Sequence, residues 1–409
     1  MPMWSRIVAI ILIWNAVPWL VLGALFSSML PGGWSVILGL ALLVLLPLRA
    51  LLRGFTGKSY PSAATRIWLL RPFWYVQLFL PLLAAAGLVG VIAGLPFSAA
   101  TAVGRGAVGV MALVLTVGAF WGYAGTRRLV VRSLDVNFPA LPQGLDGIRI
   151  VQLSDLHVGP HTPRRHLMRI AAAVRDAEPD LIALTGDQVD DFAGDVEPLG
   201  RALGGLSAPL GVIAIAGNHD VYAGWSAVRE GMERLGWTVL VNDALPRQMN
   251  GKRFWVVGTG DPAGNGGPTG PDPSVVPDVE RTLASVPTEE FTLALAHNPA
   301  LWPALAERGV ALTLSGHTHH GQLAIPRLGW SLASPFLEHA MGVHRLGDSV
   351  LYINPGTNYW GIPFRIGALP EVTVVTLHRN TVSDAAEGAS VVTEEVSPSL
   401  DGIETPQIS

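Results

Sequence analysis

The stretch "TLSGHTHHGQLAIP", Thr313–Pro326, places three histidines within four residues, directly after a short apolar run. His317, His319 and His320 are three of only 11 histidines in the 409-residue chain. Imidazole is the side chain that titrates near neutral pH and that most often binds metals. The stretch therefore predicts a chemical site at the end of a strand.

Five predicted strands end in potential ligands. The runs "IRIVQL", "LIALT", "GVIAIA", "FTLALA" and "ALTLS" are apolar on both faces, as buried strands are. The polar groups that follow them are Asp155, His157, Asp187, Asp190, Asn218, His219, Asp220, His297, His317 and His319. Ligands of layered α/β folds gather at the carboxyl ends of strands. If the five strands share one sheet edge, these side chains converge on one pocket.

Spacing supports a metal site. In Asp155-x-His157 and His317-x-His319 the two side chains point to the same side of an extended segment, and the glycines before three of the motifs allow tight turns. Each motif alone is equally well a turn or a structural group, but five in order favour a site. The candidate ligands are Asp155, His157, Asp187, Asn218, His297, His317 and His319. Seven groups suit two ions about 3.5–4 Å apart that share a carboxylate.

The composition separates two regions. Half of the residues are apolar, 14% are charged and the mean hydropathy is +0.40, but residues 1–126 are nearly free of acids. The net charge of −4 gives no reason to expect a nucleic-acid polymer as partner. Because the chain has no cysteine, a metal must be held by His, Asp, Glu or Asn, which suits Mn, Fe, Zn or Mg.

Four apolar stretches predict four transmembrane helices within residues 1–126. No charged residue occurs between Ile7 and Leu48, and "PGGW" divides this stretch; a second pair covers 72–97 and 106–125. Each is about 20 residues long, enough to cross a hydrocarbon core of ~30 Å. A cleaved signal peptide over residues 1–30 is the alternative, but its apolar region is too long and three more spans follow.

Basic residues predict the orientation. They collect between the second and third spans and after the fourth, at Arg49, Arg53, Lys58, Arg66, Arg71, Arg127, Arg128 and Arg132. The link between the third and fourth spans has only Arg105. Because positive charge collects on the cytoplasmic side, we expect a multi-pass protein of the cell membrane, with the N-terminus and the large C-terminal domain in the cytoplasm.

Residues 127–385 are predicted to form an α/β layered domain. "FWVVG" reads as a further strand, and helix-like segments occur at 164–177, 227–235, 278–286 and 301–307. The Gly- and Pro-rich stretch Asp261–Asp278 is expected to be an irregular surface loop, either a lid over the site or a loop without a role. Residues 386–409 are polar and acidic and are expected to form a disordered tail.

The order Asp-x-His, Gly-Asp-x-x-Asp, Gly-Asn-His-Asp, His and Gly-His-x-His resembles the calcineurin-like metallophosphoesterases over residues ~145–378. "HNP", "GHTHHGQ" and "GIPFRIGALPEVTVVTL" resemble the bacterial branch that often carries N-terminal membrane segments. The resemblance implies a β-sandwich flanked by helices, a dinuclear centre, and phosphate-ester or pyrophosphate hydrolysis. Some relatives in the branch resemble enzymes that cleave a UDP-linked lipid sugar pyrophosphate.

The resemblance also implies a division of the ligands. Asp155, His157, Asp187 and His319 would bind one ion, and Asp187, Asn218, His297 and His317 the other, with Asp187 bridging. Where the branch usually has Gly-Gly-Gln, this chain has His320-Gly321-Gln322, and His320 is expected near the rim rather than among the ligands.

The predicted mechanism is attack by a hydroxide that bridges the two ions, which lower the pKa of its parent water. By the same resemblance His219 binds no metal, so it is expected to protonate the leaving oxygen. Asp190 is expected to hold the His219 ring, with Asp220 as the competing candidate. The four spans favour a phospholipid or nucleotide-linked lipid substrate near the bilayer; a soluble nucleotide diester, a phosphoprotein, or a non-catalytic membrane sensor or scaffold are the alternatives.

Overall fold

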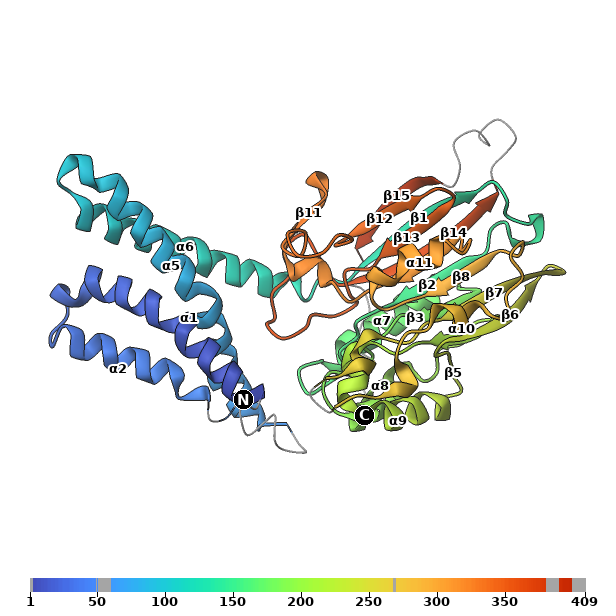
Figure 1. Ribbon diagram of the computed structural model, residues 1–409, viewed down its shortest axis with the longest axis horizontal. Coiled ribbons are helices and arrows are strands. Elements are labelled where there is room, and N and C mark those ends of the chain that lie inside the picture. Colours follow the sequence, from blue (N-terminus) through green and yellow to red (C-terminus); the bar gives the residue numbers. More distant parts are fainter. Residues whose placement is uncertain (1–2, 49, 51–59, 268–269, 380–389, 399–409) are drawn as a thin grey trace, which may run out of the picture. The chain divides into compact units, whose positions relative to one another are not determined.

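The structure is a computed structural model that describes residues 3–48, 50, 60–267, 270–379 and 390–398 (Figure 1). The chain forms two compact units, Met1–Trp121 and Gly122–Ser409. The boundary falls slightly before residue 126, the predicted end of the membrane region. The last turn of α6 (Ala100–Gly125) belongs to the second unit, where the carbonyl of Gly122 accepts a hydrogen bond from the backbone N–H of Arg365 at 2.9 Å.

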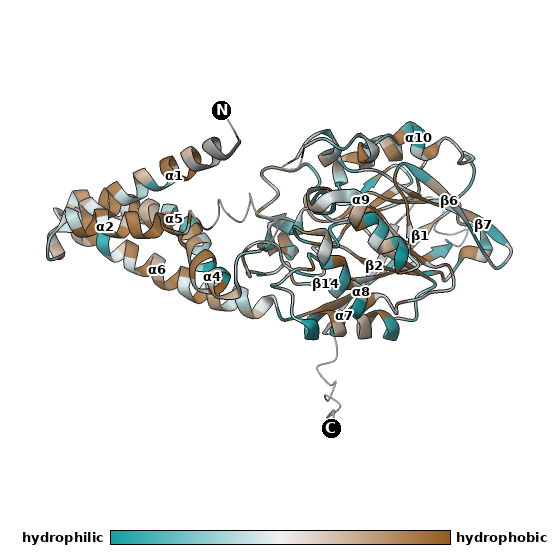
Figure 2. Ribbon diagram, turned by 90° about the horizontal axis from the view of Figure 1, so that it is seen from below, coloured by the Kyte–Doolittle hydropathy of each residue, from teal (hydrophilic) through white to brown (hydrophobic). Residues whose placement is uncertain are grey.

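The first unit is helical and apolar. Among the described residues, three stretches are long and apolar enough to cross a membrane: Ala9–Met29, Ala63–Phe97 and Ala100–Gly125. They correspond to α1 (Met3–Phe26), α5 (Arg71–Gly94) with the short helical segments that flank it, and α6. Figure 2 shows hydrophobic residues along all of them. The described structure therefore contains three of the four expected spans.

The remaining expected span contains a shorter helix. α2 (Trp34–Leu45) has 12 residues, and at 1.5 Å per residue it is about 18 Å long, well short of a ~30 Å hydrocarbon core. Residue 49 and residues 51–59, which follow it, lie outside the described residues. The expected link between the last two spans is also shorter than predicted, because α6 begins at Ala100 and includes Arg105.

The second unit is a β-sandwich. One described sheet has the order β15-β1-β14-β2-β3-β4-β5, and the facing one has the order β12-β13-β9-β8-β7-β6. The first consists of β15 (Ser390–Pro398), β1 (Val130–Phe138), β14 (Glu371–Arg379), β2 (Arg149–Leu153), β3 (Leu181–Leu184), β4 (Val212–Ala214) and β5 (Thr238–Val239). The second consists of β12 (Gly342–Leu346), β13 (Ser349–Ile353), β9 (Leu312–Ser315), β8 (Thr292–Leu295), β7 (Lys252–Gly258) and β6 (Asp243–Met249). A separate pair joins β10 (Ala324–Ile325) to β11 (Trp330–Ser331).

Three layers of apolar contacts hold this unit together. Between the sheets lies a core that includes Ile150, Ile213, Phe254 and Leu293, all fully buried. The outer face of the first sheet is covered by α7 (Arg164–Asp176), α8 (Val196–Leu203) and α9 (Asn218–Arg234), and that of the second by α10 (Val279–Leu283) and α11 (Trp302–Ala306) (Figure 1). Parallel strands covered on both faces explain the continuous apolar runs in the sequence.

All six predicted strands are present, as β2, β3, β4, β7, β8 and β9, and so are the four predicted helices, as α7, α9, α10 and α11. The expectation of a disordered tail is wrong for part of its length. Ser390–Pro398 forms β15, which pairs antiparallel with β1 and caps an edge that would otherwise leave backbone groups unpaired. The β-branched pattern of "SVVTEEVS" suits an edge strand. The rest of the expected tail lies outside the described residues.

Candidate metal centre

The candidate ligands meet at the carboxyl ends of strands from both sheets. Asp155 and His157 follow β2, Asp187 follows β3 and Asn218 follows β4, whereas His297 follows β8 and the histidines of "GHTHHGQ" follow β9. The expectation of one shared sheet edge is therefore replaced by two edges at the same end of the sandwich. Register aligns the ends, since Leu153 pairs with Leu184, and Leu295 with Leu314.

Backbone conformation at the site is unusual. Positive φ angles occur at five of the seven candidate ligands: Asp155 (51°), His157 (39°), Asp187 (54°), His317 (70°) and His319 (48°). Non-glycine residues seldom adopt this region, and when they do they cluster at functional sites. The assumption that Asp-x-His is extended is therefore wrong, because β2 ends at Leu153. Backbone hydrogen bonds join the loop after β2 to the loop after β3. The N–H of His157 donates to Asp187 O at 2.9 Å, and the N–H of Asp155 donates to Gly186 O at 3.0 Å.

Asp187 lies at the centre of the cluster. Its Oδ2 is 3.5 Å from Nε2 of His157 and 3.3 Å from Nε2 of His297. Its Oδ1 accepts a hydrogen bond from the backbone N–H of His219 at 2.7 Å, which fixes the carboxylate plane. One oxygen thus faces histidines from two different sheets.

The remaining ligands form two groups, one on each side of Asp187. In the first, Nε2 of His319 is 3.0 Å from Nε2 of His157 and 3.3 Å from Oδ1 of Asp155. In the second, Oδ1 of Asn218 is 3.2 Å from Nε2 of His297 and 2.8 Å from Nδ1 of His317. The structure therefore brings all seven predicted ligands together. Two described groups with the spacing of metal ligands consist of predicted ligands alone, Asp155 with His157 and His319, and Asp155 with Asp187 and His297. Two further groups with this spacing include His219.

The electrostatics of the cluster favour a cation. Burial lowers the pKa of a histidine. Despite burial, Asp187 raises the pKa of His297 well above its ordinary value, and Asp190 and Asp187 raise the pKa of His157. Burial alone would raise the pKa of Asp187, but His297 and His219 hold it well below its ordinary value. Buried carboxylates that draw positive charge onto histidines would equally hold divalent ions, so the residues present fit a metal centre.

Glycine at position 217 is required by a close approach. A Cβ there would overlap both the backbone N and the carboxylate of Asp187. Its φ of −108° is accessible to any residue, so the requirement comes from packing and not from the tight turn expected at this position. At Gly186, by contrast, φ is 95° and the expected turn is present.

Asp190 holds His219 by its backbone and not by its carboxylate. Nδ1 of His219 donates to the carbonyl of Asp190 at 2.8 Å. The Asp190 carboxylate instead lies 3.5 Å from Nδ1 of His157. The competing candidate Asp220 is buried and accepts from the N–H groups of Gly217 and Val189, so it supports loops and does not contact the ring. The His219 ring lies edge-on to that of His157, with the centroids 4.8 Å apart.

His320 does not lie at the rim. It is buried, and its Nε2 donates to the carbonyl of Ile353 at 3.0 Å. Burial lowers its pKa to about 3, so it is a neutral structural residue. It points away from the ligands, as expected, but into the domain.

Arg365 is a site residue that sequence reasoning missed. It is fully buried, and its Nη2 is 2.8 Å from Nδ1 of His319 while its Nη1 donates to Ala368 O and His319 O, each at 3.2 Å. A single arginine within "FRIG" carries no spacing signal, so only the fold reveals its position behind a candidate ligand.

The loop over Asp261–Asp278 contains two short 3-10 turns, Pro262–Asn265 and Pro273–Val275. A Cβ at Gly267 would overlap the ring of Tyr222, whose centroid is 5.5 Å from that of His219. The loop therefore reaches the neighbourhood of the site, although residues 268–269 lie outside the described part of the chain.

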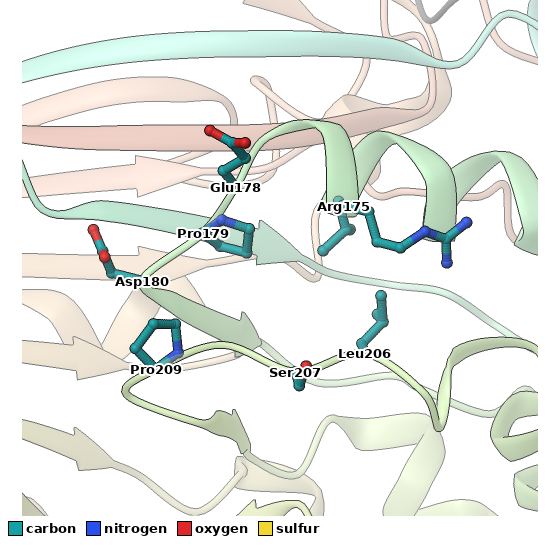
Figure 3. Close-up of a pocket in the computed structure, with 8 residues that line it drawn as sticks. Arg175, Glu178, Pro179, Asp180, Leu206, Ser207 and Pro209 are labelled. Atoms are coloured by element: carbon teal, nitrogen blue, oxygen red, sulfur yellow. The ribbon is translucent and has the colours of Figure 1, made fainter.

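A surface hollow of about 370 Å³ lies elsewhere (Figure 3). Eight residues line it, among them Asp180 and Pro209, which precede β3 and β4. It is therefore at the amino ends of strands whose carboxyl ends carry Asp187 and Asn218, and it is separate from the metal centre.

The chain is similar to known metallophosphoesterases. Residues 148–321 match the family model described as calcineurin-like phosphoesterase. An uncharacterized metallophosphoesterase of Bacillus subtilis, YkuE, is 31% identical over 67% of this chain and 95% of its own length. A transmembrane protein with metallophosphoesterase domain from Danio rerio is 32% identical over 66% of this chain and 62% of its own length, so the chain spans less than two thirds of that relative. Among solved structures, the sulfate thiohydrolase SoxB of Thermus thermophilus has a TM-score of 0.37 at 16% identity, covering 60% of each chain.

Proposed function

Because this chain belongs to the calcineurin-like phosphoesterase family, we propose that it is a membrane-anchored phosphoesterase with a dinuclear metal centre. The observation that carries the proposal is the position of Asp187 Oδ2, between His157 on one side and His297 on the other. One carboxylate oxygen within reach of two ligand groups suits a bridge between two ions.

We assign each of the two groups of side chains to one ion. Asp155, His157, Asp187 and His319 would hold one ion, and Asp187, Asn218, His297 and His317 the other. When bound, the ions would supply positive charge to the phosphoryl oxygens and activate a water for attack. Nitrogen and oxygen donors suit Mn, Fe, Zn or Mg.

We assign to His219 the role of proton donor to the leaving oxygen. The carbonyl of Asp190 can only accept, so it fixes a hydrogen on Nδ1 and fixes the ring beside the cluster. In the imidazolium form both ring nitrogens carry a hydrogen, and the one on Nε2 is then available to a phosphoryl or leaving-group oxygen. General acid catalysis of this kind is worth roughly 10²–10⁴-fold in rate.

The membrane topology is part of the proposal. We assign four spans, with the second containing α2, and both termini in the cytoplasm, because an even number of spans agrees with the distribution of arginines. An alkaline-phosphatase fusion after Arg132 should be inactive and a fluorescent-protein fusion there should fluoresce. Active phosphatase at that position would contradict the four-span topology.

The substrate class follows from the anchor. We propose a phosphate ester or pyrophosphate of the lipid phase, such as a phospholipid or nucleotide-linked lipid, since the membrane supplies it at high local concentration. A non-catalytic sensor would have no need of a complete ligand set, and here all seven groups are in contact range.

Purified full-length protein in detergent should hydrolyse an aryl phosphodiester when Mn is added and lose activity in EDTA. The rates on the aryl monoester and diester would define the preference. A protein that binds two Mn ions per chain but hydrolyses neither ester would favour the sensor or scaffold.

A further inference from the structure

Exposed apolar side chains of the second unit are concentrated in one segment. Within the described residues of that unit, ten large hydrophobic side chains are exposed, and six of them lie in residues 325–337: Ile325, Leu328, Trp330, Leu332, Phe336 and Leu337. Scattered exposed apolar residues need no explanation, but a contiguous group of them marks a contact surface. We call residues 324–337 the apolar hairpin.

The apolar hairpin projects its largest side chains outward. Ala324 pairs with Ser331 and Ile325 with Trp330, and the turn between them contains Gly329 at a φ of 58°. Phe336 is 80% exposed and Leu328 73% exposed. Figure 1 shows the segment around β11 standing off the ends of the two sheets. A two-stranded ribbon is marginal in water, so such exposure calls for a partner.

The base of the apolar hairpin lies beside the end of α6. The N–H of Ala324 donates to Ile366 O at 2.9 Å, and the N–H of Ile366 donates to Gln322 O at 3.0 Å. One residue away, Arg365 N–H donates to Gly122 O, and a Cβ at Gly122 would overlap the ring of Phe364. All of these residues belong to the second unit. The hairpin base and the last turn of a membrane-length helix thus both contact the short segment 364–366.

The end of α6 has the chemistry of a membrane–water interface. Tyr123 is exposed, its hydroxyl accepts from Nη2 of Arg127 at 2.6 Å, and the guanidinium of Arg127 lies 4.7 Å from the ring centroid. Arg128 follows and is exposed, and Arg327 is exposed in the turn of the apolar hairpin. Tyrosine and arginine concentrate at headgroup level. Tyr123, Arg127 and Arg128 are therefore the residues at which we expect the chain to leave the bilayer.

The apolar hairpin is also linked to the metal centre. The side chain of Gln322, just before it, holds the backbone of Trp360: Nε2 donates to Trp360 O at 3.0 Å, and Oε1 accepts from its N–H at 3.1 Å. The half-exposed indole of Trp360 lies 5.4 Å from the His219 ring, centroid to centroid. Trp360 therefore connects the start of the apolar hairpin to the neighbourhood of His219.

We propose that the apolar hairpin inserts into the interfacial layer of the bilayer that α6 crosses, so that the metal centre takes its phosphate ester from the lipid headgroup region. The occupant is the lipid bilayer, because α6 tethers the hairpin base at the membrane surface, and arginines flank the apolar side chains as they do in interfacial segments. The role assigned to the hairpin rests on the proposed phosphoesterase function, but its position in the bilayer does not.

The absence of cysteine from the chain permits a direct test. Single cysteines would be introduced as Leu328→Cys and Phe336→Cys in the full-length protein and labelled with an environment-sensitive fluorophore. The matched control is Leu346→Cys, an apolar side chain that is 49% exposed at the end of β12, on the side of the sandwich where β13 begins. The protein would be reconstituted in nanodiscs of phosphatidylcholine and phosphatidylglycerol.

Labels at 328 and 336 should be quenched by nitroxide lipids and protected from aqueous iodide, as expected for a depth of about 5–10 Å below the headgroups. The label at 346 should show the reverse. If all three labels are quenched by iodide alone, the proposal is overturned. Labels at 328 and 336 that are shielded from iodide, insensitive to nitroxide lipids and dependent on protein density would assign the hairpin to a second copy of the chain, which also overturns it.

Each variant would be assayed with Mn on a soluble aryl phosphodiester, because none of the three positions contacts the metal centre. Unchanged turnover shows that the fold is intact. The assay also tests the phosphoesterase function separately from the contact of the hairpin with the membrane. Lipid quenching at 328 and 336 without any hydrolysis would support the membrane contact while removing the phosphoesterase function on which its role depends.

Discussion

The carbonyl oxygen of Asp190 accepts a hydrogen bond from Nδ1 of His219 at 2.8 Å, while the Asp190 carboxylate faces Nδ1 of His157 at 3.5 Å. One residue therefore orients two histidines by two different groups. The backbone group holds the proposed proton donor, and the side chain supports a candidate metal ligand. The variants His219→Gln and Asp190→Asn should therefore have different effects, although the sequence alone gives no reason to distinguish them.

His219→Gln should keep both metal ions and lose most turnover. Glutamine can still donate to the Asp190 carbonyl but cannot protonate a leaving oxygen, so kcat should fall by roughly 10²–10⁴-fold. Metal content by mass spectrometry and kcat on an aryl diester would be compared with the parent. Empty metal sites in this variant would show that His219 acts as a ligand and not as an acid.

Asp190→Asn should weaken metal binding more than it slows catalysis. Removing a carboxylate beside a ligating histidine typically costs 10–100-fold in metal affinity, and the carbonyl that holds His219 remains. A Mn titration of activity should shift to higher concentration, with kcat recovered at saturation. A loss of kcat at saturating Mn as large as that of His219→Gln would contradict the backbone assignment.

Asp187→Asn should be the most damaging change to a ligand. Oδ2 of Asp187 faces both groups of ligands, so in the proposed centre its charge would be shared by two ions, whereas His297 belongs to one group. Metal content should approach zero in Asp187→Asn and about one ion per chain in His297→Ala, as a shared carboxylate requires. An equal or smaller metal loss in Asp187→Asn would exclude Asp187 as the bridge.

The positions of the ligands could be predicted because each follows a short apolar run whose length and flanking turn residues favour a buried strand. Asp155, Asp187 and His297 are found where those runs end. The distribution of the strands between two sheets could not be predicted from the individual apolar runs. "LIALT" and "FTLALA" are equally apolar on both faces, so neither indicates which strand it pairs with. Pairing depends on contacts between residues far apart in sequence.

Local conformation was less predictable than position. The side-chain direction of His157 was inferred from an extended segment, but its φ is 39°. The arginine behind His319 was missed because a single buried cation has no periodicity, and β15 was missed because its short β-branched pattern lies within an acidic segment. In each case a distant partner, and not the local sequence, decides the structure.

His320→Gly, which restores the residue usual in the resembling branch, should lower stability slightly and leave catalysis unchanged. His320 has a φ of 48°, and glycine would relieve about 1 kcal/mol of backbone cost. Loss of the buried bond to the Ile353 carbonyl and of side-chain packing costs about 2–3 kcal/mol. A net loss of roughly 1–2 kcal/mol should appear as a lower melting temperature. A change in KM or kcat larger than twofold would instead place His320 in the substrate site.

Gly217→Ala should disrupt the metal centre through packing alone. Its φ of −108° accepts alanine, but the new Cβ would overlap the backbone N and the carboxylate of Asp187, and forced displacement in a packed site costs typically about 1–3 kcal/mol. Metal content and melting temperature should both fall. The control is Gly205→Ala, where no atom lies within 4 Å of the added Cβ and no positive φ occurs; it should gain or lose no more than about 1 kcal/mol and keep its metal. If Gly217→Ala retained two ions at parental affinity, Asp187 would have room to move, and the rigid bridge that the proposed function requires would not exist.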